Sequence, residues 1–562
     1  MTRTIGLADR IRWMLVAAAL GALALAWSVS LAAGHGQLPT LPAASITSPA
    51  GSSASLDPRI AGVAARRPNE VVQTIVQFKA GVGPARARQD VARVGGTVFG
   101  ELPIINGLAV RLTAARARQL AASPGVHAVS LNATVTVQNA AFGPSHGLGR
   151  HGSGTGNLQT TYDGTLDVTQ AWQDGIMGDG IGVAVIDTGI DGGLPDFEGS
   201  TGHSSRVVET AVTNPKAQTA IDTYGHGTDV AGIIAGDGDN LNPSDPLHGH
   251  YIGVAPHADL ISVKVSDDQG RATVLDVIYG LQFAVDHRSD FNIRVVNLSL
   301  DEKTAQSYTT DPLDAAVESA WMHGLVVVAA AGNRGTSPDA VQYAPANDPY
   351  VITVGAIDEN GTSNPADDTI APWSSQGTTQ DGFQKPDVYA PGVDIISVLA
   401  PDSQFASMCP TCVVGGEYIQ TSGTSMATPM ISGLVALLLQ AHPSWTPDEV
   451  KGALTDPSVA SNPSLQEVDA AKVLALQNPA PADGGLTPNT LVNGTTGDID
   501  YSQSSWSQSS WSQATGSLAA AFAQSSWSCT CAASGDGGVG PSTSSWSTSS
   551  WSTYFDDTST AG

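Results

Sequence analysis

The sequence predicts an α/β fold in which helices cover both faces of a mostly parallel sheet. Two observations support this prediction. Continuous apolar runs suit strands that are buried on both faces, and segments with the apolar spacing of helices lie between them. Strands that alternate with helices favour a parallel sheet, because each helix carries the chain back to the edge where the next strand begins. The strand segments are 182–186, 260–265, 293–300 and 324–330, and the helical segments are 274–287 and 312–323.

The length and charge of the chain indicate more than one structural unit. Its 562 residues exceed what one hydrophobic core usually supports, and 41% of them are hydrophobic, which is typical of a globular protein. Residues 1–150 hold 14 of the 25 Lys and Arg but only 5 of the 52 acidic residues, a balance of +9 that leaves −36 for the remainder. So acidic a body argues against nucleic acid as a partner. The opposite charges favour association of the two parts.

The N-terminal residues are typical of an export signal. Arg3, Arg10 and Arg12 precede an uncharged apolar run at 13–33 that ends in small residues. We expect residues 1–36 to be a signal peptide or, because a run of roughly twenty residues can span a bilayer, a signal anchor. The protein is therefore expected to be secreted, with attachment to the cell surface left open. Residues 37–69, rich in Pro, Ser and Ala, indicate a linker.

Residues 70–139 predict a small separate domain. Its order of strand, helix, strand, strand, helix, strand suggests a ferredoxin-like α+β unit. The strand signals lie at 72–78, 107–112 and 126–131, and the helical segments lie at 86–94 and at 113–122, where Thr113 suits the N-cap. Residues 140–156, with six glycines between Gly143 and Gly156, indicate an open linker that a protease could enter.

Residues 478–562 differ from the rest of the chain. Pro, Gly, Ser and Thr dominate, and Ser-Ser-Trp-Ser recurs with a spacing of five that fits neither a helix nor a strand. We expect a low-complexity, disordered tail. A Trp-bearing surface module is the alternative. The tryptophans of this repeat are Trp506, Trp511, Trp527, Trp546 and Trp551.

Four cysteines fall in two close pairs, Cys409 with Cys412 and Cys529 with Cys531. For an exported chain, a disulfide between Cys409 and Cys412 is favoured, and it would brace the loop that leads to Ser425. A closed zinc site needs about four ligands, and the second pair lies in a very different segment. A thiol-redox motif is the weakest alternative, because nothing around it resembles thioredoxin. Pairing of Cys529 with Cys531 stays open.

Residues 423–429, Gly-Thr-Ser-Met-Ala-Thr-Pro, place Ser425 at the start of an apolar, helix-like run. A helix N-terminus presents unpaired N–H groups and the positive end of the helix dipole, and both favour an oxyanion. The same stretch also suits an ordinary capped helix start. Because serine needs a base and an orienting carboxylate to act as a nucleophile, the chemistry depends on partners elsewhere.

His226 and Asp187 are the candidates for those partners. His226 stands between two glycines before the helix-like run 229–235, and Asp187 ends the apolar strand at 182–186. In parallel sheets chemistry gathers at the carboxyl ends of the strands, where Asp187, Ser299 and Asn333 all stand. Asp-Thr-Gly at 187–189 also occurs in aspartic proteases. Those proteins need a second such motif, and the chain has none.

In chain order these motifs resemble those of the subtilisin-like serine proteases. The resemblance rests on Asp-Thr-Gly at 187–189, Gly-His-Gly-Thr at 225–228, Ala-Gly-Asn at 331–333 and the stretch 423–429, and it covers about residues 157–477. It implies a subtilisin-like peptidase domain. It also implies that residues 70–139 are an inhibitory propeptide, cleaved from the mature protein within 143–156.

The resemblance also implies a role for each motif residue. Ser425 would be the nucleophile, His226 the general base and Asp187 the orienting carboxylate. The side chain of Asn333 would donate a hydrogen bond to the oxyanion. Ser299 and Leu300 would belong to the segment that holds an extended substrate through backbone hydrogen bonds.

Several residues depart from the family's pattern or leave a metal site open. Asp229 stands where the family often has histidine, Asp301 follows Leu300 in place of a glycine, and Arg334 could reach the rim of the primary specificity pocket. We therefore predict no preferred substrate side chain. The chemistry needs no cofactor, but structural calcium is allowed for: Asp196 resembles a family calcium ligand and equally suits a turn cap. The nearby polar loop holds Asp237, Asp239 and Asp245.

These observations predict a secreted serine endopeptidase, made as a zymogen, that hydrolyses peptide bonds of proteins through an acyl-enzyme intermediate. Its partners would be protein or peptide substrates and its own propeptide. The alternative is a catalytically silent subtilisin-like module that binds surfaces through the Trp-Ser tail. A membrane or cell-surface tether through 13–33 or the tail is left open.

Overall fold

The computed structural model describes residues 54–137, 141–142, 162–199, 205–486 and 488–489. The chain divides into Met1–Ser52 and Ser53–Gly562, and every described residue belongs to the second unit. The predicted signal segment, the glycine-rich stretch 143–156 and the Ser/Trp repeats lie outside the described residues.

The small domain has the predicted ferredoxin-like order. Its sheet runs β1-β5-β2-β4-β3, in which β2 is antiparallel to both β4 and β5. Thr113 occupies the N-cap of α4, although its side chain makes no capping hydrogen bond. The elements are β1 (Ser55–Leu56), α2 (Pro58–Arg66), β2 (Val71–Phe78), α3 (Pro84–Arg93), β3 (Thr97–Leu102), η1 (Pro103–Ile105), β4 (Gly107–Thr113), α4 (Ala114–Ala121) and β5 (Val126–Leu131).

The structure differs from the linker expected at 37–69, because β1 and α2 occupy its second half. The Asp57 side chain caps α2 by accepting from the Arg59 N–H at 2.8 Å, and Pro58 suits the first helical position. Ile60 of this helix is fully buried in the core of the small domain. The sequence did not predict this helix, because the segment is rich in Pro, Ser and Ala and Ile60 is the one buried side chain of α2.

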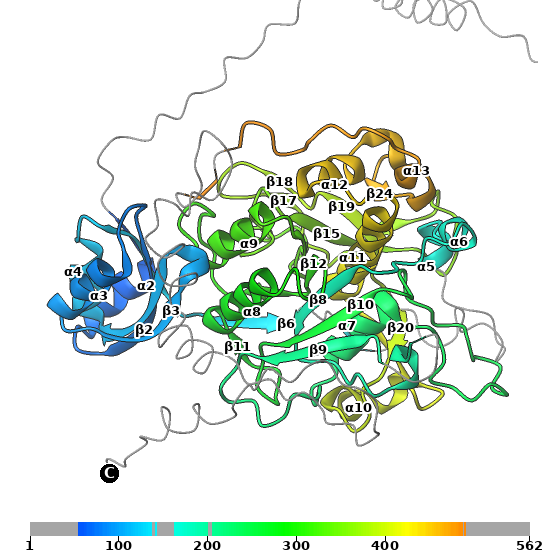
Figure 1. Ribbon diagram of the computed structural model, residues 1–562, viewed down its shortest axis with the longest axis horizontal. Coiled ribbons are helices and arrows are strands. Elements are labelled where there is room, and N and C mark those ends of the chain that lie inside the picture. Colours follow the sequence, from blue (N-terminus) through cyan, green and yellow to red (C-terminus); the bar gives the residue numbers. More distant parts are fainter. Residues whose placement is uncertain (1–53, 138–140, 143–161, 200–204, 487, 490–562) are drawn as a thin grey trace, which may run out of the picture. The chain divides into compact units, whose positions relative to one another are not determined.

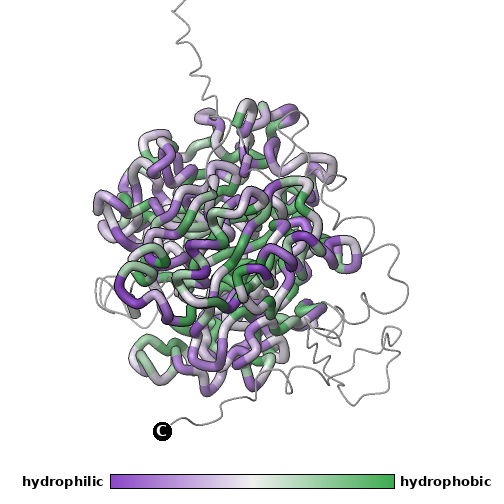
Figure 2. Tube along the Cα trace, turned by 90° about the vertical axis from the view of Figure 1, so that its left-hand side faces the viewer, coloured by the Kyte–Doolittle hydropathy of each residue, from purple (hydrophilic) through white to green (hydrophobic). Residues whose placement is uncertain are grey.

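The large domain contains the predicted, mostly parallel sheet (Figure 1). Eight parallel strands run in the order β24-β19-β15-β14-β12-β8-β10-β9. The apolar strands lie inside and the hydrophilic loops outside (Figure 2). The strands are β8 (Gly182–Asp187), β9 (Val207–Val212), β10 (Asp259–Lys264), β12 (Ile293–Leu298), β14 (Val326–Ala330), β15 (Ile352–Asp358), β19 (Val388–Pro391) and β24 (Glu467–Val468).

Helices cover both faces of this sheet. The helices α7 and α11 pack together, and α11 lies against β12, β14 and β15, while α8 and α9 pack together against β8 and β14. In the described part of the chain α11 alone is long and apolar enough to span a bilayer, and it is buried in the fold. The longer helices are α7 (His226–Ala235), α8 (Val274–Asp286), α9 (Pro312–Met322), α11 (Thr424–Ala441) and α12 (Pro447–Leu454).

Two smaller sheets flank the carboxyl ends of the strands. One has the order β11-β6-β13, and the other joins β20, β22, β21 and β7. Their strands are β6 (Thr134–Val137), β7 (Ala141–Phe142), β11 (Ala272–Thr273), β13 (Leu300–Glu302), β20 (Ile395–Val398), β21 (Val413–Val414) and β22 (Tyr418–Ser422). The remaining elements are α5 (Tyr162–Thr165), α6 (Thr169–Gln173), η2 (Pro195–Phe197), β16 (Thr369–Ile370), β17 (Gly377–Thr378), β18 (Gln384–Lys385), α10 (Gln404–Met408), η3 (Pro410–Cys412), η4 (Pro457–Val459), β23 (Ala460–Asn462) and α13 (Ala470–Leu474).

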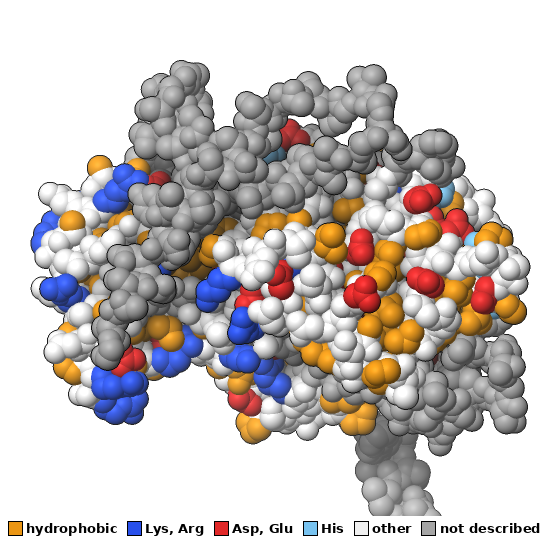
Figure 3. All heavy atoms as spheres, turned by 90° about the horizontal axis from the view of Figure 1, so that it is seen from below, with side chains coloured by type: hydrophobic (Ala, Val, Ile, Leu, Met, Phe, Trp, Pro, Cys, Tyr) orange, Lys and Arg blue, Asp and Glu red, His pale blue; other side chains and the backbone are white. Residues whose placement is uncertain are grey.

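The charge asymmetry of the sequence is visible on the molecule. On the face drawn in Figure 3, most of the visible Lys and Arg side chains gather toward one side and the Asp and Glu side chains toward the other. This separation agrees with the +9 and −36 that the sequence assigns to the two parts of the chain.

Leu434 tests how far α11 supports the fold. Its side chain is fully buried, so Leu434→Ala should lower the free energy of unfolding by about 2–5 kcal/mol through lost burial and the remaining cavity. Urea unfolding measures the change. The control is Val208→Ala at an exposed position of β9, where the loss should be about 0.5 kcal/mol or less. Equal losses in both variants would contradict the central role of α11.

Candidate active site

The end of β8 and the start of α7 bring a carboxylate and an imidazole together. Nδ1 of His226 lies 2.7 Å from Oδ1 of Asp187, and both side chains are fully buried. A carboxylate only accepts hydrogen bonds, so Nδ1 donates, and Nε2 of the neutral ring is left as the acceptor. The close approach requires glycine at 227, because a Cβ there would lie 2.1 Å from the carbonyl oxygen of Gly189.

Asp222 fixes the two segments that carry this pair. Its buried carboxylate accepts five hydrogen bonds, two of them from hydroxyl groups on either side of the pair. No local sequence pattern distinguishes Asp222 from the exposed acidic residues of the chain. The five donors are Thr188 Oγ1, the N–H groups of Tyr224, Gly225 and Thr228, and Thr228 Oγ1.

Buried carboxylates set the protonation of His226. Burial alone would lower the pKa of the imidazole, but the charges of Asp187, Asp229 and Asp222 outweigh it and raise the pKa above its ordinary value. Asp229 is itself buried, and burial raises its pKa to about 7. Its Oδ2 accepts from the Thr421 hydroxyl at 2.8 Å. The residue that departs from the family's pattern therefore links α7 to β22, the strand that leads to Ser425.

Ser425 stands in the first turn of α11, as the sequence predicts. Its Oγ donates to the carbonyl oxygen of Ser299 at 3.2 Å, and the Ser299 hydroxyl donates to the Ser425 carbonyl at 3.0 Å. That carbonyl lacks its helical partner because Pro429, four residues on, has no N–H. The nucleophile candidate is therefore tied directly to the predicted substrate segment.

Among the described residues, Nε2 of His226 has no hydrogen-bond partner. The structure thus brings Asp187 to His226 and Ser425 to Ser299, whereas the described residues hold no bond between Ser425 and His226. Bonds of this kind are often long or absent before substrate binds.

The amide of Asn333 is oriented by Thr424, the residue before the candidate nucleophile. Oδ1 of Asn333 accepts from the N–H and from the hydroxyl of Thr424, both at 3.1 Å. The amide oxygen only accepts, so Nδ2 is the group that would donate to an oxyanion, and the two contacts at Oδ1 fix the orientation of the amide. The sequence indicates the orienting role of Thr424 only by its place next to Ser425 in the stretch 423–429.

Two segments of the chain itself lie along the predicted substrate path. Strand β6 lies between β11 and β13 and is antiparallel to both, with Val137 opposite Leu300 and Thr136 opposite Asp301. Strand β7 is antiparallel to β22, with Ala141 opposite Ser422. Residues 138–140, which join the two strands, lie outside the described residues.

Arg334 forms an ion pair with Asp301 of β13, the strand that pairs with β6. The guanidinium of Arg334 bonds to the buried Asp301 carboxylate and lies over the Tyr343 ring, 3.8 Å from its centroid. Burial raises the pKa of Asp301 to about 6, although Arg334 acts in the opposite direction. The two departures noted in the sequence therefore act as one unit.

The described residues contain no group of three His, Cys, Asp or Glu side chains spaced to hold a metal ion. Asp196, the candidate calcium ligand, accepts at Oδ1 from the Asn240 N–H at 2.7 Å and from the Tyr418 hydroxyl at 3.1 Å. Of the polar loop that follows His226, Asp237 lies 3.6 Å from the guanidinium of Arg206. Both contacts of the Asp196 carboxylate come from residues far along the chain and not from the turn at Pro195, whereas Asp237 faces a cationic side chain.

Comparison with known proteins agrees with this geometry. A model described as the Subtilase family matches residues 178–469. Serine protease AprX of Bacillus subtilis (strain 168) is 42% identical over 286 residues, which are 50% of this chain and 61% of that protein. Subtilisin E of the same organism is 32% identical over 387 residues, 68% of this chain and 83% of that protein.

The structural comparison points the same way. The crystal structure of fervidolysin from Fervidobacterium pennivorans, described as a keratinolytic enzyme related to subtilisin, aligns with a TM-score of 0.55 and 26% identity. The alignment covers 73% of this chain and 62% of that one.

Asp229→Asn tests the electrostatics of the pair. The negative charge of Asp229 raises the pKa of His226, so its removal should lower that pKa, while the amide can still accept from Thr421. An NMR titration of the His226 imidazole measures the change. Asp239→Asn, at an exposed position of the polar loop, is the control and should leave the titration unchanged. A His226 pKa that stays the same or rises in Asp229→Asn would refute this account.

Proposed function

The chain belongs to the subtilase family of serine-type endopeptidases, and from this premise we propose that it hydrolyses peptide bonds through Ser425, His226 and Asp187. The observation that supports the assignment best is the fully buried 2.7 Å hydrogen bond between His226 and Asp187. It fixes the imidazole in the tautomer that a general base requires. Ser425 at the start of α11 supplies the nucleophile.

The reaction follows from these groups. Ser425 Oγ attacks the substrate carbonyl carbon and gives its proton to Nε2 of His226, and the buried carboxylate of Asp187 stabilises the imidazolium that forms. Nδ2 of Asn333 and the N–H groups at the start of α11 donate to the oxyanion. The imidazolium then protonates the leaving amine, which yields an acyl-enzyme. Water, deprotonated by the same imidazole, hydrolyses the ester and restores Ser425.

The substrates proposed are proteins or peptides bound as an extended strand between β11 and β13. Strand β6 of the chain itself is held there by backbone pairing, which supports this mode of binding. Backbone pairing does not discriminate between substrate side chains. The Asp301–Arg334 pair beside the strand is therefore a feature that could discriminate between substrates.

We extend the proposal to a zymogen in which the small domain, through β6 and β7, occupies the cleft until the chain is cut. The antiparallel pairing of β6 and of β7 on the two sides of 138–140 supports this. The basic small domain would also be attracted to the acidic peptidase domain. Export from the cell through residues 1–36 completes the proposal. Labelling of Ser425 separates it from the silent surface-binding alternative.

Ser425→Ala should abolish labelling by an active-site serine phosphonate. It should also lower kcat/KM toward a protein substrate by at least about 10⁴-fold, because neither the base nor the oxyanion donors can replace the nucleophile. Labelling followed by mass spectrometry identifies the modified residue. Ser337→Ala, outside the site, is the control and should be labelled like the wild type. Full activity in Ser425→Ala would exclude the assigned nucleophile.

The strand register supports a processing point closer to the small domain than the glycine-rich stretch. Because β6 pairs with β13 and β7 pairs with β22, we expect the cleaved bond to lie between Val137 and Ala141. N-terminal sequencing should therefore find mature protein that begins at a residue from 138 to 141. The Ser425→Ala chain should stay uncut there. Mature protein that begins before Glu70 would refute the propeptide role, and a start within 143–156 would refute the register.

A further inference from the structure

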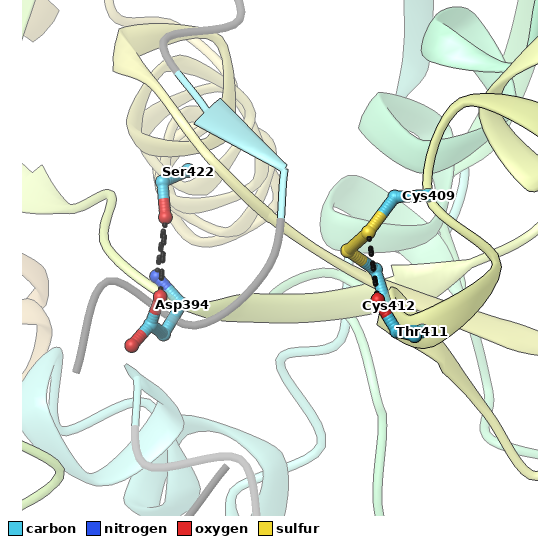
Figure 4. The surroundings of a disulfide bond; sticks show 5 residues. All are labelled: Asp394, Cys409, Thr411, Cys412 and Ser422. Atoms are coloured by element: carbon cyan, nitrogen blue, oxygen red, sulfur yellow. Dashed lines mark hydrogen bonds between the residues drawn. A yellow bond between two sulfur atoms is a disulfide. The ribbon is translucent and has the colours of Figure 1, made fainter. Parts of the chain in front are cut away.

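A loop between β20 and β22 lies against the start of α7. Residues 399–417, which we name the disulfide loop, are closed at their base by the Leu399 N–H, which donates to the Glu417 carbonyl at 3.0 Å. The loop contains α10, η3 and β21. The predicted Cys409–Cys412 disulfide is present within it (Figure 4).

Phe405 is the side chain through which the disulfide loop reaches His226. The Phe405 ring is fully buried, and its centroid lies 5.9 Å from that of the imidazole, with 83° between the two planes. This edge-to-face arrangement is one that aromatic pairs prefer. Asp187 holds only Nδ1 of the imidazole, so the ring could still turn about that bond. Phe405 contacts the ring itself and thereby restricts the plane in which Nε2 lies.

The backbone of the disulfide loop is fastened to the same segment. The N–H groups of Gln404 and Phe405 donate at 3.0 Å to the carbonyls of the two residues that precede Gly225. Gly225 has φ +108°, and a Cβ there would lie 2.7 Å from Ser403 Oγ and 2.8 Å from Phe405 Cβ. The loop therefore packs so closely on the residue before His226 that only glycine fits.

The disulfide belongs to the packing that holds Phe405. Leu399, Phe405, Cys412 and Ile419 form a buried cluster separate from the main core. The Cys409 N–H donates to the Phe405 carbonyl at 3.2 Å, which fixes the end of α10. Cys409 packs against this cluster from its edge, so both sulfur atoms of the disulfide belong to residues that surround Phe405.

We propose that the disulfide loop positions the general base: Phe405 fixes the plane of the His226 ring, and the Cys409–Cys412 disulfide keeps Phe405 against it. Phe405 is a positioning residue, since its role is exerted through the His226 ring. This role rests on the proposed function, which makes His226 the base. The sequence predicted that the disulfide braces the approach to Ser425, and Cys412 does pack with Ile419 of β22, the strand that leads there. Through Phe405 the same cluster also reaches the segment of the base.

Phe405→Leu should lower kcat by roughly ten- to a hundredfold, because small misplacements of a catalytic group cost rates of this order. KM should stay within about twofold, since no substrate contact is lost. Phe283→Leu is the matched control: Phe283 is also buried, and its ring lies 4.5 Å from that of His287, a histidine outside the site. The control should lose thermal stability but keep kcat. An unchanged kcat in Phe405→Leu, or an equal fall in Phe283→Leu, overturns the proposal.

Opening the disulfide is an independent test if Phe405→Leu fails to fold. A dithiol such as dithiothreitol gives two electrons and two protons to the disulfide, which yields the two thiols Cys409 and Cys412 and a cyclic disulfide of the reagent. We expect kcat to fall in the wild type as these thiols appear, measured by mass-labelling with iodoacetamide. The double variant Cys409→Ser/Cys412→Ser should show the lowered kcat without reductant and no further fall with it. A fully reduced wild type with unchanged kcat overturns the proposal.

The His226 Nδ1 proton gives a readout that does not depend on turnover. Its NMR resonance should be sharp in the wild type and in Phe283→Leu, and broadened by solvent exchange in Phe405→Leu and in the double serine variant. If the wild type shows no peptidase activity, the proposed function fails, and this resonance alone decides the positioning role. Broadening then supports the role, and an unchanged resonance overturns it.

Discussion

The site depends on one buried carboxylate that takes no part in the chemistry. Asp222 accepts from the hydroxyl of Thr188 beyond the end of β8, and from the N–H and hydroxyl of Thr228 in the first turn of α7. These bonds hold the strand end and the helix start at the separation at which Asp187 and His226 meet. Because the carboxylate is buried, each unmade bond would cost the desolvation of its partner as well. The geometry of the pair is therefore set before any substrate arrives.

The proposed nucleophile, Ser425, depends on a second network, which exists because Pro429 has no N–H. If residue 429 were not proline, its N–H would donate to the Ser425 carbonyl within the helix. Here that carbonyl accepts from Ser299, whose hydroxyl in turn accepts from Asn297 Nδ2 at 3.1 Å. Ser432, two turns along α11, donates to Asn297 Oδ1 at 2.8 Å. These bonds connect the start of α11 to the end of β12. They therefore fix the position of Ser425 relative to the segment proposed to bind the substrate.

The sequence could predict what short-range patterns encode. The apolar runs became β8, β10, β12 and β14, and the motif residues stand at strand ends and helix starts because glycines and small residues mark those turns locally. Contacts made across long separations left no such mark. Asp222 meets Thr188 across 34 positions, and α2 resembled a linker because one buried isoleucine carries its packing. Phe405 lies far along the chain from His226, so the sequence predicted the Cys409–Cys412 disulfide but not the contact between its loop and His226.

In this acidic domain, buried cationic side chains bind carbonyl and carboxylate oxygens of neighbouring loops. Lys451 Nζ bonds to the carbonyls of Pro349 and Tyr350 and to Asp483, and Lys385 Nζ bonds to the carbonyl of Val351 and to Asp387. Carbonyl oxygens and carboxylates are also the ligands of hard metal ions. An ammonium or guanidinium bound by such oxygens is covalently part of the chain. Unlike a metal ion, it therefore occupies its site at every ion concentration. Arg206 acts in the same way near Asp196, donating to the Ala235 carbonyl at 2.5 Å and to the Asp196 carbonyl at 2.6 Å. Lys451, Lys385 and Arg206 are themselves buried, so removing any of them would leave buried acceptors unpaired.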